Sequence, residues 1–247
     1  MQFSCLCCGH RTLTRRPGYS HQLCDVCCFE DRLHPRGQLA GAQAAYAALG
    51  VVDPELRELA RAARPEEAPP SWFLSLEEAP GALLTLVFEA FGDQDLAGGV
   101  CLAEAEHIDD YALPSRDHTE PPPAGFGASG PWHELTRGTL DAYHWCPFSF
   151  MDARGLRYYT PAYIRYFLVE SDGAVWESSF LFMLESSHRI EALISMLTPD
   201  QRYAVARYLA YLTSDPGGFW AEDAQSALRR WWGRYLDPDH LSHVIPQ

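Results

Sequence analysis

The chain has 247 residues, 47% hydrophobic and 13% aromatic, which is enough apolar material for one large globular domain or two smaller ones. The formal net charge is −14, all the basic residues are arginines, and residues 53–120 alone carry −12. An acidic body of this kind argues against binding along a phosphate backbone, which needs clustered basic side chains. The sequence contains neither a run of eighteen apolar residues nor a leader pattern, so we expect a cytoplasmic protein without a membrane span.

Six of the eight cysteines lie within residues 5–28, a segment too short and too poor in large apolar residues to form its own core. Cys5/Cys8 and Cys24/Cys27 make a C-x2-C-x15-C-x2-C frame, and four thiolates at this spacing suit a tetrahedral zinc ion. Gly9 tolerates positive φ, which lets backbone amides turn toward the sulfurs. The spacing therefore predicts a small zinc ribbon with one structural Zn²⁺ bound by these four cysteines.

Several alternatives remain open for the same cysteines. They could form disulfides or, since C-x2-C also occurs in redox proteins, an exchanging dithiol. Cys7 and Cys28 are left over as buried thiols or as ligands of a second metal. Cys7 and His10 also have x2 spacing, so the register of the first ligand pair is not unique.

The same residues resemble the bacterial cysteine-rich CPCC domain. Its pattern runs C-P-C-C-G-[aromatic]-x-T-L and then C-x-V-C-[aromatic]-W-E-D-D, and the resemblance covers about residues 3–50. It implies a cysteine-rich domain without an established activity. The departures from the pattern, none of which affects the four expected ligands, are Leu6, His10, Cys28, Phe29 and Arg32.

The helical pattern begins after the cysteines. Apolar spacing predicts a helix over 39–49 that Gly50 ends, and Asp53 as N-cap predicts another to about Arg64. Residues 65–71 are rich in proline and glutamate, which is typical of a linker. We therefore predict an α+β, helix-dominated protein with three parts: a ribbon at 1–52, a helix and linker at 53–77, and a mainly helical domain at 78–247.

The rest of the chain is expected to be mostly helical. The pattern predicts that Leu156–Tyr159 is extended and that Thr160–Pro161 begins a helix. Thr198-Pro199-Asp200-Gln201 is a capping box that opens the most regular helix. Residues 113–131, with five prolines and three glycines, predict a long loop. The other helical segments are expected over 83–91, 102–111, 135–145, 175–184, 190–197 and 220–236.

Three motifs resemble a bacterial domain of unknown function. They are G-x-R-Y-Y-x-P-A-Y at 155–163, L-T-P-D-Q-R at 197–202 and L-A-E-A-E-H-I-D at 102–109. The resemblance would cover about residues 78–236. It implies a shared architecture and no particular chemistry.

Three groups of side chains could carry chemistry, and each also has a purely structural interpretation. His144 and Cys146 offer an imidazole and a thiol, but residues two apart on a helix face different sides. Arg157 and Tyr158–Tyr166 could line a pocket, although aromatic residues near a helix start usually pack in a core. The acidic run could form a carboxylate–histidine metal cluster or simply a solvated acidic face. Its residues are Glu104, Glu106, His107, Asp109 and Asp110.

We expect a zinc-binding, non-enzymatic protein-interaction module that neutralises a basic, toxin-like partner protein, because acidity and aromatic residues suit such a contact. The alternative is an enzyme with a site around Tyr158–Tyr166 and the acidic run 104–110. A third hypothesis, a nucleic-acid-binding ribbon, rests only on Arg11, Arg15, Arg16, Arg32 and Arg36.

Overall fold

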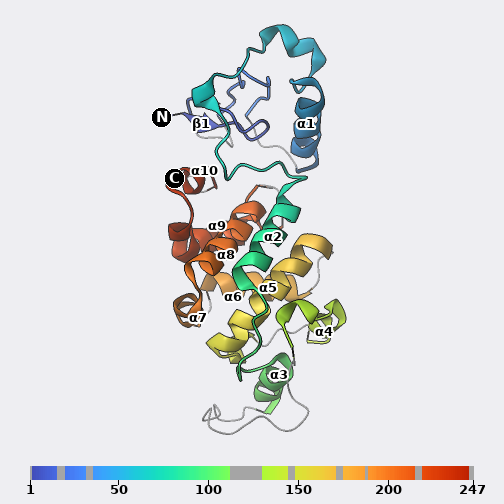
Figure 1. Cartoon of the computed structure of the whole chain (residues 1–247), viewed down its shortest axis with the longest axis vertical. Coiled ribbons are helices and arrows are strands. Elements are labelled where there is room, and N and C mark those ends of the chain that lie inside the picture. The colour runs from blue at the N-terminus through green and yellow to red at the C-terminus, as the bar shows by residue number, and fades with distance from the viewer. Residues whose placement is uncertain are drawn as a thin grey trace. The chain divides into compact units, whose positions relative to one another are not determined.

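The structure, a computed structural model, describes residues 2–15, 20–31, 36–111, 130–143, 148–170, 175–186, 189–214 and 219–244. Helices predominate, and the strands in this part of the chain are β1 (Phe3–Ser4) and β2 (Arg11–Leu13), which pair antiparallel (Figure 1). The prediction of a helix-dominated chain with a small N-terminal β element is confirmed. No helix within the described ranges has both the length and the apolar character needed to cross a membrane.

Two compact units can be distinguished. The first comprises Met1–Ala82, Leu209–Gln225 and Leu236–Gln247, and the second comprises Leu83–Tyr208 and Ser226–Tyr235. The predicted three-part division at residues 52/53 and 77/78 stays a prediction.

The first unit contains α1 (Arg36–Leu49), which ends at Gly50 with φ +75° as the sequence predicts. Asp53 is an N-cap, because its carboxylate accepts a hydrogen bond from the amide of Glu55, 2.9 Å away. The α-helix predicted to reach Arg64 is wrong: only the 3₁₀ helix η1 (Pro54–Leu59) forms. None of the residues of η1 is buried, so no packing stabilises a longer helix there.

The remaining elements of the first unit are short. The 3₁₀ helix η2 (Pro65–Glu67) lies within the predicted linker, and α9 (Ala221–Ala227) and α10 (Pro238–Val244) come from the end of the chain, with α9 extending two residues into the second unit. The unit's core consists of the cysteines together with a few apolar side chains, chiefly Leu13, Val26, Phe29, Leu39 and Leu76.

The second unit is built from helices around an aromatic core. The ring of Tyr163 stacks on that of Phe180 at 5.3 Å and lies 5.1 Å from Trp176. Most of its helices match the expected segments. They are α2 (Ala79–Phe91, shared with the first unit), α3 (Leu102–Tyr111), α4 (Arg137–Asp141), α5 (Ala153–Glu170), α6 (Val175–Ser186), α7 (Ile190–Met196) and α8 (Pro199–Leu212, also shared), with short turns η3 (Trp132–Glu134), η4 (Phe148–Phe150), η5 (Leu228–Trp232) and η6 (Gly233–Tyr235).

Helix α5 begins earlier than predicted. The extended segment expected at Leu156–Tyr159 is wrong, because the helix starts at Ala153 and continues through Pro161. The Asp152 carboxylate accepts the amide of Gly155 at 2.8 Å, and thereby caps the first turn. Thr160 does not cap a helix start: its hydroxyl donates back to the carbonyl of Leu156 within the helix, at 2.7 Å.

A glutamine compensates for the proline inside α5. Pro161 has no N–H, so the carbonyl of Arg157 loses its partner in the helix. The Gln94 side-chain amide donates to this carbonyl at 2.8 Å, while its oxygen lies 3.4 Å from the side-chain nitrogen of Gln201. Gln201 and Thr198 form the predicted capping box of α8, with reciprocal bonds of 3.1 and 3.2 Å. Gln94 therefore links the site of the missing hydrogen bond in α5 to the start of α8.

The Gln94–Arg157 bond can be tested by a double-mutant cycle. We expect Gln94→Met to lower the free energy of unfolding by about 1–3 kcal/mol, because it leaves a carbonyl without its donor. In a Pro161→Ala background the cost should be smaller, because the alanine supplies the N–H that the Arg157 carbonyl needs. Urea unfolding of the four proteins measures the coupling. Equal costs in both backgrounds would contradict this account.

Candidate metal centre

The first cysteine pair lies on a tight turn that follows β1. The amide of Gly9 donates to the carbonyl of Cys5 at 3.0 Å, and the amide of Cys5 donates to the carbonyl of His10 at 2.9 Å. Gly9 has φ +74°, as its position in the motif predicts. The amide of Cys7 points at the Cys5 sulfur, 3.4 Å away. The turn thus places Cys5 and Cys8 on one side and directs a backbone donor at their sulfurs.

The second pair repeats this geometry. The amide of Cys28 donates to the carbonyl of Cys24 at 2.8 Å, and the amide of Cys24 donates to the carbonyl of Phe29 at 2.9 Å. Cys28 takes the place of Gly9 and has φ +61°, a conformation that costs a non-glycine residue about 1–2 kcal/mol. The two turns are therefore equivalent in backbone geometry, although only one uses glycine.

The two turns face each other and bring four sulfurs together. The sulfurs of Cys5, Cys8, Cys24 and Cys27 all lie within 4.8 Å of one another, and all four residues are buried. The Cys5–Cys27 and Cys8–Cys24 sulfur pairs are both separated by 3.7 Å. This exceeds the S–S bond length of about 2.05 Å, and the seven cysteines within the described ranges are free thiols. The four buried cysteines could hold a metal ion.

The remaining candidates of the cysteine-rich segment do not join the cluster. Cys7 is buried beside it, and Cys28 points its sulfur at the carbonyl of Leu56, 3.5 Å away. His10 is hydrogen-bonded through its ring to the carbonyl of Cys8 at 3.2 Å. Among the described residues, the four expected cysteines are the one group of metal-binding side chains that converges. Cys7 and His10 do not belong to this group.

The charge chemistry of the cluster favours a cation. Hydrogen bonds from Cys27, Cys5 and Cys8 lower the pKa of Cys24, and the Thr12 hydroxyl, 3.1 Å away, adds to this effect. The same interactions with Cys24 raise the pKa of Cys5, Cys8 and Cys27. One thiolate is thus stabilised while three sulfurs resist ionisation. A bound dication would lower the pKa of all four thiols, because it compensates the charge of each thiolate.

Two residues of the predicted 53–77 segment, Phe73 and Leu76, lie near the first cysteine turn. Gln43 of α1 donates to the carbonyl of Leu6 at 3.0 Å and accepts from the amide of Leu76 at 2.8 Å. The ring of Phe73 packs on Gly9 so closely that a Cβ there would lie 2.5 Å from it. Phe73 therefore contacts the first turn directly, and Leu76 is linked to it through Gln43.

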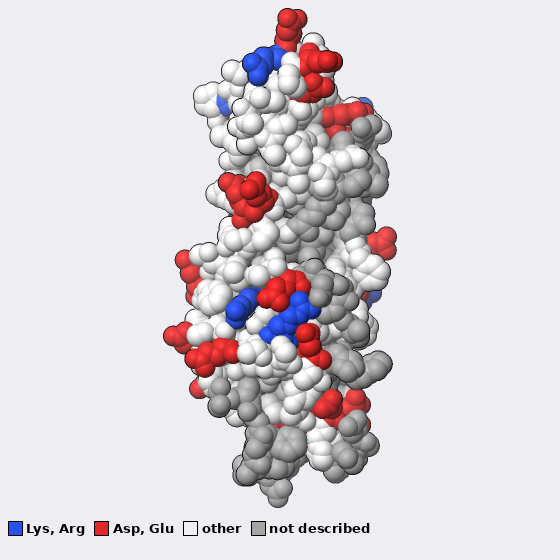
Figure 2. All heavy atoms as spheres, turned by 90° about the vertical axis from the view of Figure 1, so that its right-hand side faces the viewer, with Lys and Arg blue, Asp and Glu red and all other residues white. Residues whose placement is uncertain are grey.

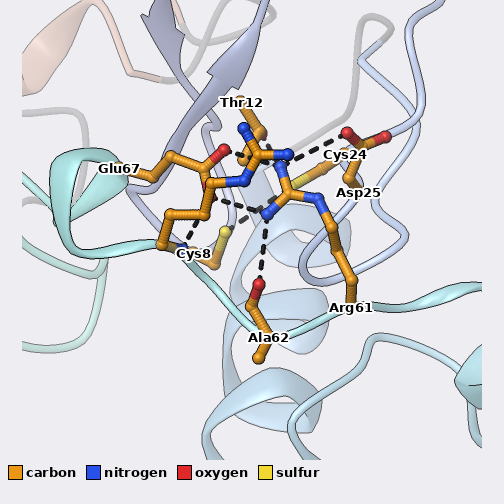
Figure 3. Close-up of polar contacts among 8 residues, drawn as sticks. Cys8, Thr12, Cys24, Asp25, Arg61, Ala62 and Glu67 are labelled. Atoms are coloured by element: carbon orange, nitrogen blue, oxygen red, sulfur yellow. Dashed lines mark hydrogen bonds and ion pairs between the residues drawn. The ribbon is translucent and has the colours of Figure 1, made fainter.

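An ion pair lies beside the second turn. The guanidinium of Arg61 donates to both carboxylate oxygens of Glu67 at 2.6 and 2.7 Å, and it also reaches Asp25 at 3.4 Å (Figure 3). Arg61, together with the amide of Arg64, lowers the pKa of Glu67 from 4.5 to about 2. This contribution to stability is present above pH 4.5 and is lost as the pH falls toward 2.

The other predicted sites have structural roles or lie outside the described residues. Tyr158 and Tyr159 are buried, and their hydroxyls bond the carbonyl of Gly130 and the amide of Leu102. Burial raises the pKa of Tyr158 to about 12 and raises that of Tyr159, so both phenols stay protonated at neutral pH. His144, Cys146 and most of the predicted 113–131 loop lie outside the described ranges.

The acidic run 104–110 does not gather around a metal site in the described part of the chain. Glu104 is buried, whereas Asp109 is exposed, so the two carboxylates have different surroundings. The side chain of Asp110 is outside the described residues.

Sequence reasoning missed Gln43, Arg61 and Glu67. Gln43 and Arg61 contact Leu6 and Asp25, which lie more than thirty positions away in the sequence. Glu67 pairs with Arg61 within a segment that has the composition of a linker. A proline-containing segment that also carries both arginines and glutamates was the available signal, but such charges usually lie on a solvated surface.

The fold and the cluster define a class: a helix-dominated protein with a buried four-cysteine site able to hold a metal ion. A comparison with protein families assigns the second part of the chain. Residues 81–236 match the model of a family of unknown function, DUF6714, and the chain belongs to this family. The matched range agrees with the extent expected for the domain of unknown function. No curated protein and no solved structure matches the chain.

The contact between Gly9 and Phe73 can be tested with a matched pair of glycines. Gly9→Ala should cost about 1–2 kcal/mol for the left-handed backbone, plus the cost of displacing Phe73. Gly50→Ala is the control, because Gly50 has φ +75° and nothing within 4 Å of the added Cβ. Denaturant unfolding should show the larger loss of stability for Gly9→Ala. Equal losses would mean that the ring moves away freely.

Proposed function

We propose that the four cysteines bind one structural Zn²⁺ and that residues 1–52 form a zinc ribbon. The single observation that carries this proposal is the sulfur geometry. Tetrahedral zinc with Zn–S bonds of about 2.3 Å requires sulfurs about 3.8 Å apart, and the facing pairs are 3.7 Å apart. Cys5, Cys8, Cys24 and Cys27 would supply all four bonds. The zinc would contribute cross-linking of the two turns.

The burial of the cluster supports a structural role for the metal. The cysteines are at most 5% exposed, so four thiolates would close the coordination shell. Catalytic zinc sites keep one position for water or substrate, whereas structural sites are closed. The resemblance to the CPCC domain agrees with a cysteine-rich module of this kind.

The wider function we propose is a non-enzymatic protein-interaction module for a basic partner. The net charge of −14 supports it, as do exposed acidic side chains in the first unit at Asp53, Glu55, Glu58, Glu66 and Glu77. Figure 2 shows acidic groups at several separate places on one face, some of them beside basic groups. A partner would therefore meet scattered acidic contacts, whose main effect is to steer association. Neutralisation of a toxin-like protein would be one use of such a surface.

Metal content tests the first part of the proposal. The purified protein should carry about one zinc per chain by elemental analysis. Cys8→Ser and Cys24→Ser should each lose the metal and unfold the first turns, because the site cannot close with three thiolates. Cys7→Ser is the matched control, since Cys7 is buried beside the cluster but outside it, and it should keep the zinc.

Two outcomes would contradict the zinc proposal. A wild-type protein that binds no zinc, even after refolding with the metal, would contradict the proposal. Loss of zinc from Cys7→Ser but not from Cys8→Ser would show that the ligand register is wrong.

Salt dependence tests the partner. A basic protein recovered with this chain at low ionic strength should bind more weakly near 0.15 M salt, where the screening length is about 8 Å. Glu55→Arg with Glu58→Arg should slow association more than it speeds dissociation, because both side chains are exposed. Glu104 is unsuitable for this test, because it is 8% exposed and its reversal would disturb the fold. Binding unaffected by salt and by both substitutions would contradict a basic partner.

A further inference from the structure

Residues 52–61 make three bonds to the second cysteine turn. The amide of Val52 donates to the carbonyl of Cys27 at 2.9 Å, and the amide of Arg61 donates to the carbonyl of Asp25 at 2.9 Å. Between them, the carbonyl of Leu56 accepts a hydrogen bond from the thiol of Cys28. The segment thus contacts the turn at its start, middle and end, and two of the contacted residues are Cys27 itself and the neighbour of Cys24.

The far end of this segment is fastened by the Arg61–Glu67 ion pair. Both terminal guanidinium nitrogens of Arg61 donate to the Glu67 carboxylate, which is only 1% exposed, and the amide of Arg64 donates to it at 2.8 Å. Two-pronged pairs of this kind fix geometry as well as charge. The backbone amide and the side chain of Arg61 both reach Asp25, so the position of Arg61 determines two contacts with the second turn.

The first cysteine turn is held differently. Its contacts include the Gln43 side chain on Leu6, the Phe73 ring on Gly9 and the edge-on contact of His10 with Tyr46, none of which pairs two charges. Of the contacts described for the two turns, the Arg61–Glu67 ion pair supports those of the second cysteine turn. A change in one charged residue should therefore affect Cys24 and Cys27 selectively.

We infer that residues 52–67 form a clamp on the Cys24–Cys28 turn that controls how fast the metal leaves, with the Arg61–Glu67 ion pair as its latch. The inference rests on the proposed zinc site. Metal release requires at least one sulfur to move away, and displacement of the backbone that carries Cys24 and Cys27 would break the bonds from Val52 and Arg61. While the latch is closed, Arg61 stays in place and those bonds re-form. Arg61 and Glu67 are positioning residues, since neither touches the metal ligands directly.

The rate of zinc transfer from the full-length protein to excess 4-(2-pyridylazo)resorcinol tests the clamp. Glu67→Gln keeps the size of the side chain but removes its charge, and it should release zinc about tenfold faster or more, as for other residues that orient metal ligands. Glu66→Gln is the matched control, because Glu66 is adjacent and exposed, and it should release zinc at the wild-type rate. Arg61→Lys keeps the charge but loses the two-pronged geometry, so its rate should be intermediate.

Trypsin provides a readout that does not depend on metal transfer. Trypsin cleaves after arginine unless proline follows, so Arg57 and Arg61 are the cleavable positions of the clamp, whereas Arg64 precedes Pro65. Cleavage there should be slow in the zinc-loaded wild type, and faster after zinc removal or in Glu67→Gln.

The outcomes separate the clamp from the zinc site. A wild-type protein without zinc would overturn the proposed function. A zinc-loaded Glu67→Gln that releases metal and is cleaved as slowly as Glu66→Gln would overturn the clamp alone. If Glu67→Gln cannot be loaded, Arg61→Lys decides: faster release supports the clamp, and an unchanged rate overturns it.

Discussion

Four cysteine sulfurs within 4.8 Å of one another are the feature on which the first compact unit depends. The core around these sulfurs combines the cysteines with apolar side chains such as Leu13, Phe29 and Leu39. Four thiols packed this closely cannot all ionise without a compensating cation, because each thiolate raises the pKa of its neighbours. A bound metal ion would compensate the thiolate charges and form four bonds. The free energy of unfolding of the unit should therefore depend on the metal occupancy of the site.

In the second unit, a side-chain amide compensates for a missing backbone donor. Pro161 removes a backbone donor from the middle of a buried helix, and Gln94 supplies a replacement from another part of the chain. Gln201 links the same glutamine to the capping box of α8. Two of the motifs that resemble the domain of unknown function, around Pro161 and around Thr198–Gln201, therefore meet in one hydrogen-bond network. This gives both motifs a structural reason to occur together, and it requires no catalytic role.

The parts that the sequence predicted correctly are those governed by local rules. Cysteine spacing located the cluster, glycine located the turn at residue 9, and the capping box located α8. The errors arose where distant residues decide the outcome. Thr160–Pro161 has the pattern of a helix start, but Gln94 allows the helix to pass through it. The segment around residues 53–67 has the composition of a linker, but Arg61 and Asp25 are joined across 36 positions. No local pattern contains either contact.

The two cysteine turns show how equivalent backbone geometry can be stabilised by different neighbours. Gly9 and Cys28 occupy the same position in their turns, and both have positive φ. At the first turn the absence of a side chain makes room for Phe73, so glycine is needed for packing as well as for conformation. At the second turn a side chain is present, and its thiol contacts Leu56 of the clamp. The backbone cost of Cys28 is therefore offset by a contact that Gly9 cannot make. Each turn is matched to the segment that covers it, and exchanging the two residues would disrupt both.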